Sequence, residues 1–154
     1  MLILAAVQKS ELIAHLKQVL AEKVDAIRAY IAATLHARNS DTKSSAGDKH
    51  EVGRAMIQQE LDQQEAQLAK LHGLQQELER VPMDRVYERA AFGSLVTTDH
   101  GIYFIAIGMG LIDLGREECY VISLASPAGQ ALKDSRVGEA VTFGGRTITI
   151  SGIT

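Results

Sequence analysis

The sequence predicts an α+β protein in which an antiparallel helical hairpin precedes a small, mostly antiparallel β domain with one short helix. Residues 10–79 carry apolar side chains at helical spacing around one polar stretch, and Pro82 ends the pattern. The chain beyond Pro82 is rich in Val, Ile, Thr, Tyr and Phe, which suit strands. We therefore expect one part at residues 1–82 and another at residues 83–154.

The first predicted helix runs from Ser10 to about Ala37, a stretch without Gly or Pro. Ser10 is a good N-cap, and Glu11 in the first turn complements the helix dipole. The apolar residues recur in steps of four and three, as one stripe of a helix requires: Leu12, Leu16, Leu20, Val24, Ile27, Ile31 and Leu35.

The second predicted helix runs from Glu51 to about Glu79. Its apolar residues repeat near helical spacing at Val52, Met56, Ile57, Leu61, Leu68, Leu71, Leu74 and Leu78. Two helices of similar length joined by a short polar turn pack antiparallel, and each arm would be about 40 Å long. Such a hairpin is either a structural or dimerising coiled coil, or a probe that carries its polar tip to a distant place.

The stretch 38–50 is predicted to be the turn at the tip of the hairpin. It lacks large apolar residues and is rich in Ser, Asn, Asp and Gly. Ser44–Asp48 is equally able to begin the second helix, because Ser and Asp are cap residues. The ionisable residues near the tip are three acids and three bases: Asp41, Asp48, Glu51, Lys43, Lys49 and Arg54.

The tip acids have two interpretations. Carboxylates are the hard oxygen ligands that Mg²⁺ prefers, usually one or two from the protein with waters and phosphates. An acid delivered to another enzyme's metal site helps to hold an ion or to orient a water. The simpler interpretation is that acids and bases at an exposed loop serve solvation and helix capping.

The second part is predicted to contain five strands, Phe92–Thr97, Ile102–Ile107, Cys119–Leu124, Ala140–Phe143 and Thr147–Ile153. Residues 99–101 and Gly144-Gly145 are typical of hairpin turns. Ser126 as N-cap with Pro127 at the first helical position predicts a single helical turn that ends near Lys133.

Composition and motifs exclude several classes of protein. The formal net charge is −3, with 11 acids and 10 bases up to Pro82 and 8 acids and 6 bases beyond it, so neither part has the basic excess of a dedicated nucleic-acid binder. No phosphate-binding loop or nucleophile elbow is present, and Gly108-x-Gly110 indicates a turn. The histidines show no metal-ligand spacing and are interpreted as solvated or capping residues: His15, His36, His50, His72 and His100.

Cys119 is the only cysteine, which fits a reducing compartment and excludes a disulfide framework. A lone Cys in an apolar run is typical of a small buried hydrophobe rather than a nucleophile. The apolar run Leu2–Val7 is too short for a signal peptide or a membrane span. We expect this run to pack against the rest of the protein or against a second copy.

Three C-terminal blocks form an ordered set: Phe92-Gly93-Ser94-Leu95-Val96, Ala125–Leu132, and Val137–Val141 with Gly144-Gly145. This set resembles the Gre family of bacterial transcription elongation factors, and the second block is similar to the family's S-P-(I/L)-(A/G)-x-A-L sequence. The resemblance implies an FKBP-like β domain and a coiled-coil hairpin that enters the secondary channel of RNA polymerase. It also implies that the loop with Ser126 and Pro127 contacts the polymerase.

The tip resembles the same family less closely. Cleavage-competent members carry G-D-x-x-E-N-A, whose Asp and Glu help to coordinate the catalytic Mg²⁺, whereas this chain reads Ser40-Asp41-Thr42-Lys43-Ser44-Ser45-Ala46. The resemblance implies an accessory catalytic and metal-binding role for Asp41. Ser44 stands at the Glu position and cannot replace a carboxylate's charge, which leaves Asp48 and Glu51 as candidate substitutes.

The predicted function is therefore a cytoplasmic regulator of bacterial RNA polymerase that is not itself an enzyme. We expect no cofactor of its own, only Mg²⁺ shared with the polymerase, and contact with nucleic acid only through the polymerase. We expect neither a membrane nor a small-molecule substrate as partner, and a monomer or weak oligomer. The alternatives are a non-catalytic interaction rod and an FKBP-like peptidyl-prolyl isomerase, whose aromatic pocket is hard to build from three Phe, four Tyr and no Trp.

Overall fold

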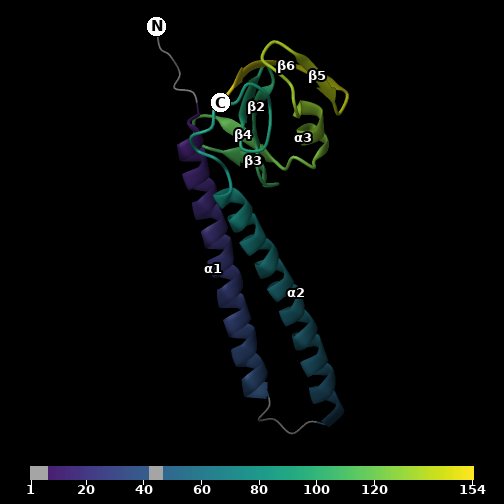
Figure 1. The fold of residues 1–154 in the computed structure, drawn as a ribbon. Coiled ribbons are helices and arrows are strands. Elements are labelled where there is room, and N and C mark those ends of the chain that lie inside the picture. Colours follow the sequence, from purple (N-terminus) through teal and green to yellow (C-terminus); the bar gives the residue numbers. More distant parts are fainter. Residues whose placement is uncertain (1–6, 42–46) are drawn as a thin grey trace. The chain divides into compact units, whose positions relative to one another are not determined.

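A computed structural model describes the backbone of residues 7–41 and 47–154 and the side chains of residues 7–39 and 51–154. The chain divides into two compact units, a helical unit formed by Leu16–Gln76 and a β-rich unit formed by Met1–His15 with Glu77–Thr154. Two long helices are followed by six strands with one short helix between the fourth and fifth strands (Figure 1). The predicted α+β fold class is confirmed.

The helical unit contains most of the antiparallel helices α1, Lys9–Asp41, and α2, Gly47–Glu79 (Figure 1). Each helix has 33 residues and is therefore about 50 Å long. Both helices extend into the stretch 38–50. Helix α1 continues to Asp41, beyond its predicted end, and α2 begins at Gly47, within the range Ser44–Asp48 that was predicted as an alternative helix start. Polar residues such as Arg38 and Asn39 do not end a helix in the way that Gly or Pro does.

The apolar seam of the helical unit is fully buried at a few positions and half-buried at the others. Leu16, Leu20 and Val24 are buried, and so is Leu61 on α2. The remaining seam positions are half-buried: Ile27, Ile31, Leu35, Ile57, Leu68, Leu71 and Leu74. The prediction that the stripe on the first helix faces the second helix is consistent with this burial.

Val52 and Met56, whose spacing fits the apolar pattern of the second helix, do not lie in the seam. Their side chains are 61% and 66% exposed, whereas Gly53 and Ile57 are half-buried. Positions 52 and 56 have helical spacing, but so do positions 53 and 57 on the neighbouring stripe. Spacing alone does not choose between adjacent stripes, and the seam follows the one that continues to Leu61.

Polar side chains link the two helices near the half-buried seam positions Ile31, Leu35 and Ile57. The Tyr30 hydroxyl donates to Glu60 Oε1 over 2.9 Å, and Arg38 donates to Gln58 Oε1 over 3.3 Å. The hydrogen bond to Glu60 and the charge of its carboxylate raise the pKa of Tyr30. These bonds help to fix the register of the hairpin where little apolar area is buried.

The β-rich unit is built on a six-stranded sheet in the order β3-β4-β2-β1-β6-β5. The strands are β1 Leu95–Thr98, β2 Gly101–Ile105, β3 Gly110–Asp113, β4 Glu118–Ile122, β5 Ala140–Phe143 and β6 Arg146–Ile153. Neighbouring strands are antiparallel except β2 and β4. The sheet is therefore mostly antiparallel, as predicted.

Strand β3 was not predicted, because its residues were interpreted as following a turn at Gly108-x-Gly110. It has only four residues, three of them exposed, and it begins at Gly110, whose φ of +76° favours glycine. An edge strand of this kind buries too little apolar surface to show the alternation that identifies strands in sequence.

The central strand β2 is buried on both faces, from Ile102 to Ile105. One face contributes Tyr103 and Ile105 to the main core cluster, which is completed by residues of the other strands, α3 and a preceding loop: Ala90, Val96, Leu132, Val141, Ile148 and Ile150. The short helix α3, Pro127–Leu132, adds Leu132 to this cluster. The core therefore anchors the end of α3 to the sheet.

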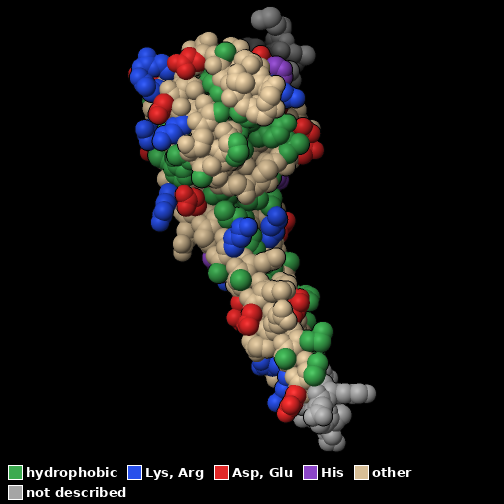
Figure 2. All heavy atoms as spheres, turned by 90° about the vertical axis from the view of Figure 1, so that its right-hand side faces the viewer, with side chains coloured by type: hydrophobic (Ala, Val, Ile, Leu, Met, Phe, Trp, Pro, Cys, Tyr) green, Lys and Arg blue, Asp and Glu red, His purple; other side chains and the backbone are tan. Residues whose placement is uncertain are grey.

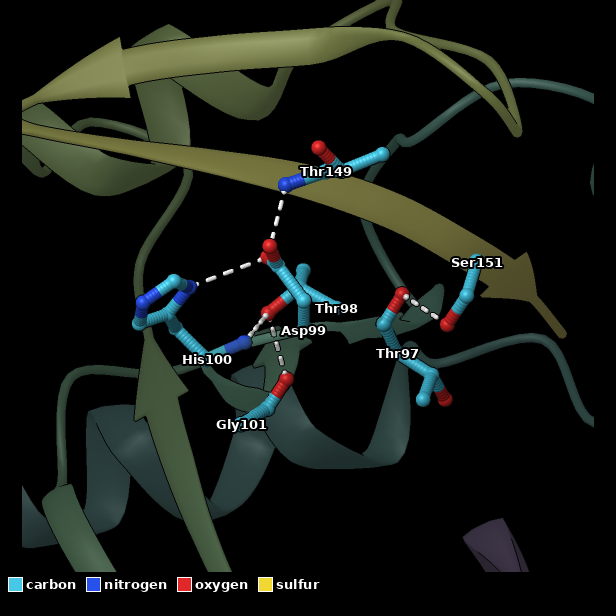
Figure 3. Close-up of polar contacts among 7 residues, drawn as sticks. All are labelled: Thr97, Thr98, Asp99, His100, Gly101, Thr149 and Ser151. Atoms are coloured by element: carbon cyan, nitrogen blue, oxygen red, sulfur yellow. Dashed lines mark hydrogen bonds and ion pairs between the residues drawn. The ribbon is translucent and has the colours of Figure 1, made fainter.

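The predicted hairpin turns are both present. Gly144 and Gly145 connect β5 to β6 with φ of +59° and +76°, the positive values that a type I′ turn requires. Asp99 and His100 connect β1 to β2 (Figure 3). Gly101, predicted within this second turn, is the first residue of β2.

The Asp99 turn is held by a polar network that reaches β6 (Figure 3). Asp99 Oδ1 accepts from the Thr149 backbone N–H over 2.8 Å and lies 3.0 Å from His100 Nδ1. The Thr98 hydroxyl donates to the Gly101 carbonyl over 2.7 Å and accepts from the His100 backbone N–H over 3.1 Å. The bond from Thr149 and the contact with His100 lower the pKa of Asp99.

Replacing Asp99 with asparagine is expected to reduce stability in a pH-dependent way. A folded-state pKa below the ordinary value of 3.8 means that the charged carboxylate stabilises the fold above that pH. This contribution is lost as the pH falls through the lowered pKa. Urea unfolding at about pH 7 and about pH 3 should show wild type and variant converging at the lower pH. A constant difference would contradict the assignment.

Candidate functional site

The predicted polymerase-contacting residues, Ser126 and Pro127, form the start of helix α3. Ser126 is the N-cap, with φ −67° and ψ 159°, and its hydroxyl accepts from the Gly129 backbone N–H over 3.0 Å. The same hydroxyl donates to the Ser123 carbonyl over 2.7 Å. The predicted helix start is confirmed, and the side chain of Ser126 is committed to holding this loop together.

Gly129 is a structural requirement of this loop that the sequence motif alone did not explain. A Cβ at Gly129 would collide with the carbonyl oxygen of Ser123 and would lie 2.8 Å from that of Leu124. The Gln130 side chain also donates to the Leu124 carbonyl over 2.7 Å. The first turn of α3 is therefore packed directly on the backbone of the loop that precedes it.

Pro127 is the residue of this loop best placed to meet a partner. It is exposed, whereas Ser126 is half-buried and Gly129 is buried. Because proline has no N–H and sits at the first helical position, its exposure costs no backbone hydrogen bond. The loop thus presents an apolar ring on a backbone held by several hydrogen bonds.

The predicted catalytic residues at the tip are placed by the ends of the two helices. Asp41 is the last residue of α1 and Asp48 is the second residue of α2. The side chains of both lie outside the described residues, as do Lys43 and Ser44. Glu51 lies one turn further along α2 and is exposed. Positions 48 and 51 lie near the start of α2, where the helix dipole favours an acid.

Behind the tip, α1 and α2 together form a cavity of about 500 Å³ with a basic lining. Its lining contains two guanidinium groups, one from each helix, together with neutral residues: Arg38, Arg54, Asn39, Ala55 and Gln58. Basic and acidic side chains gather at this end of the hairpin (Figure 2). Of these residues, the sequence analysis named Arg54 as part of the tip. It could not place Arg38 beside Arg54, because that placement depends on the register between the two helices.

The predicted metal-binding role of the tip falls mostly on side chains that lie outside the described residues. Among the side chains that the structure describes, no three His, Cys, Asp or Glu residues come together as a metal site. Glu51 is an exposed single carboxylate.

Three aromatic residues come together on the sheet. The rings of Tyr103 and Tyr120 stack at 5.0 Å between centroids, and Phe143 meets Tyr103 edge-on at 5.9 Å. Tyr103 is buried and belongs to the main core cluster. This arrangement is a packed core contact, so it gives the isomerase alternative no specific support.

Cys119 is fully buried on β4, in agreement with the interpretation as a small core residue. Burial raises the pKa of its thiol to about 12, so the thiolate that a nucleophile needs is scarce at neutral pH. None of the helices in the described parts of the chain is long and apolar enough to span a membrane.

Comparisons with known proteins find similarity among solved structures. No protein-family model and no curated protein matches the chain. Among solved structures, the chain is similar to the crystal structure of GreA factor homolog 1 (Gfh1) of Thermus thermophilus. The identity is 19%, the alignment covers 90% of this chain and 94% of that chain, and the TM-score is 0.35.

Proposed function

We propose that this protein is a Gre-type regulator of bacterial RNA polymerase. Its β-rich unit docks on the enzyme through the Ser126–Pro127 loop, and its helical hairpin enters the secondary channel. The observation that carries the proposal is the set of C-terminal blocks that resemble the Gre family. One of them forms a rigid, solvent-facing loop with Pro127 exposed at its start.

The dimensions and surface of the hairpin support the second half of the proposal. Helices of 33 residues are about 50 Å long, and most of their side chains outside the seam are exposed. A well-hydrated hairpin of this length is suited to reaching a recessed site. In this role Asp41 is an accessory carboxylate near the polymerase's own Mg²⁺, and the protein contributes no cofactor.

Binding to core RNA polymerase tests the docking half of the proposal. We expect association at moderate salt, and we expect Pro127→Asp to weaken it by at least about tenfold, because the apolar contact is replaced by a charge. An acid is well tolerated in the first turn of a helix, so α3 should remain folded. Leu111→Asp, an exposed position on edge strand β3, is the matched control and should bind like wild type.

Two results would count against docking through this loop. Failure of the wild-type protein to associate would reject the polymerase as partner. Equal affinity of Pro127→Asp and wild type would leave the partner in place and reject the loop as the anchor. Circular dichroism of each variant checks that the fold is retained.

Transcript cleavage tests the tip separately from docking. Ser44 at the family's Glu position supplies no charge to a Mg²⁺ ion, so wild type should not accelerate RNA shortening in stalled, backtracked complexes. Asp41→Ala should behave like wild type in this assay. Acceleration by wild type that is lost in Asp41→Ala would show that the tip is competent despite Ser44 and that Asp41 is required for it.

A further inference from the structure

A groove of about 670 Å³ lies within the β-rich unit, where the start of α1, the segment after α2 and the end of β6 come together. Two large apolar side chains of its lining are open to solvent, Val86 with 87% and Met83 with 51% of its surface exposed. Val7 and Ile153 also line the groove and are half-buried. Large apolar side chains exposed in one concave site are typical of a surface that binds a partner.

Two cations line the same groove, and no described acid neutralises them. Lys9 Nζ lies 4.6 Å from the centre of the Tyr87 ring, and the Arg85 guanidinium carbon lies 4.9 Å from it. The ring has no net charge, so these contacts position both cations without balancing them. The described lining contains no Asp or Glu, and neither cation forms an ion pair with a described carboxylate. The groove therefore holds two positive charges beside exposed apolar surface.

Lys9 has the greater need of a counter-charge. Its side chain is half-buried, and this burial lowers the pKa of its ammonium group because the charged form loses solvation. A carboxylate within about 4–6 Å would offset that loss. The nearby acids of the chain are placed elsewhere: Glu11 pairs with Arg116 over 2.9 Å. Asp84 and Glu88 lie outside the groove lining. An acidic group of another molecule is therefore favoured beside Lys9.

The end of β6, which lines the groove, also offers backbone hydrogen-bonding groups. Leu95 and Thr154 exchange two backbone hydrogen bonds, of 2.8 and 2.9 Å. The next pair of this antiparallel ladder, Val96 with Ile153, is therefore non-hydrogen-bonded, and the N–H and C=O of Ile153 point away from β1. Strand β5 does not cover that edge at Ile153, because it pairs only with residues 146–149 of β6. An extended polypeptide can bond to such an edge, whereas an acyl chain cannot.

We propose that this groove docks an extended segment of a partner protein in which an acidic side chain lies next to apolar ones. The apolar side chains cover the exposed part of the groove, the carboxylate meets Lys9 and Arg85, and the backbone pairs with Ile153. Apolar contact supplies affinity, and the two cations select an acidic segment over a basic one. The inference goes beyond the proposed function, because it involves neither the loop before α3 nor the tip of the hairpin.

Selection from a random heptapeptide library on the full-length protein tests the proposal. The enriched peptides are expected to carry Asp or Glu next to an aliphatic or aromatic residue. The best of them is then synthesised with a fluorescent label, together with a counterpart in which Asn or Gln replaces each Asp or Glu. Fluorescence anisotropy should show at least about tenfold weaker binding of the uncharged counterpart. Binding of the acidic peptide should also weaken as the salt concentration rises.

Matched variants locate the peptide in the groove. Arg85→Gln and Val86→Ser each change an exposed side chain of the lining, and each should weaken binding of the acidic peptide by at least about fivefold. Arg89→Gln and Val137→Ser make the same changes at exposed positions outside the lining and should bind like wild type. Because all four positions are exposed, the fold should be retained, and circular dichroism checks this.

Four results would overturn the proposal. The first is a selection that enriches no peptide. The second is equal affinity for the acidic peptide and its uncharged counterpart, which would make the groove a purely apolar site. The third is equal binding of the acidic peptide to wild type and Arg85→Gln, which would place the peptide elsewhere. The fourth is a dimer in light scattering that Val86→Ser dissociates, because the groove would then bind a second copy of the chain.

Discussion

Replacing Gly129 with alanine is expected to lower the free energy of unfolding of the β-rich unit by about 2–3 kcal/mol. The added methyl group would collide with the carbonyl oxygen of Ser123 and approach that of Leu124. Both are backbone atoms, so the strain is relieved only by moving the loop that precedes α3. Urea unfolding followed by circular dichroism measures the loss.

Gly108→Ala is the matched control for this prediction. A Cβ at Gly108 would meet no atom within 4 Å, and its φ is not in the left-handed region. Its unfolding free energy should stay within about 0.5 kcal/mol of wild type. If Gly129→Ala were as stable as Gly108→Ala, the tight packing of α3 on its own loop would be refuted. In Gly129→Ala, movement of the loop that precedes α3 should also shift Pro127 and weaken the binding of a partner to that loop.

The second large effect is expected in the helical unit. Leu61→Ala removes a buried seam side chain from α2 and should cost about 2–5 kcal/mol, because apolar burial is lost and a cavity is left. Met56→Ala, on the exposed face of the same helix, should change stability by no more than about 0.5 kcal/mol. Thermal unfolding followed by the helical circular dichroism signal compares the two. Equal losses would place Met56 in the seam, as its spacing first suggested.

The two-part organisation and several of the elements could be predicted from the sequence, because each has a strong local signal. The stripe from Leu12 to Leu35 and the change of composition after Pro82 are properties of neighbouring residues, and so is the Ser126-Pro127 helix start. The Gly144-Gly145 turn needs positive φ at both positions, which glycine adopts without strain. In each case the residues that give the signal are the residues that form the structure.

The features that could not be predicted depend on partners far along the chain. The choice of the stripe through Gly53 and Ile57 over that through Val52 and Met56 is made by packing against α1. Strand β3 is recognised only through its pairing with β4. The role of Gly129 depends on where the Ser123 carbonyl points. The catalytic assignment of Asp41, Asp48 and Glu51 stays a prediction from the family resemblance.

The pairing of β1 with both β2 and β6 has a consequence for how the protein is made. Thr98 pairs with Gly101 of β2 on one side and with Ile150 of β6 on the other. One edge of β1 therefore pairs with a strand that follows directly in sequence, and the other edge pairs with a strand near the end of the chain. On the ribosome, where N-terminal segments emerge first, the helices complete early and rely on contacts close in sequence. The nascent sheet keeps β1 open along one edge until β6 emerges, and that interval is when the growing chain is most exposed to mispairing.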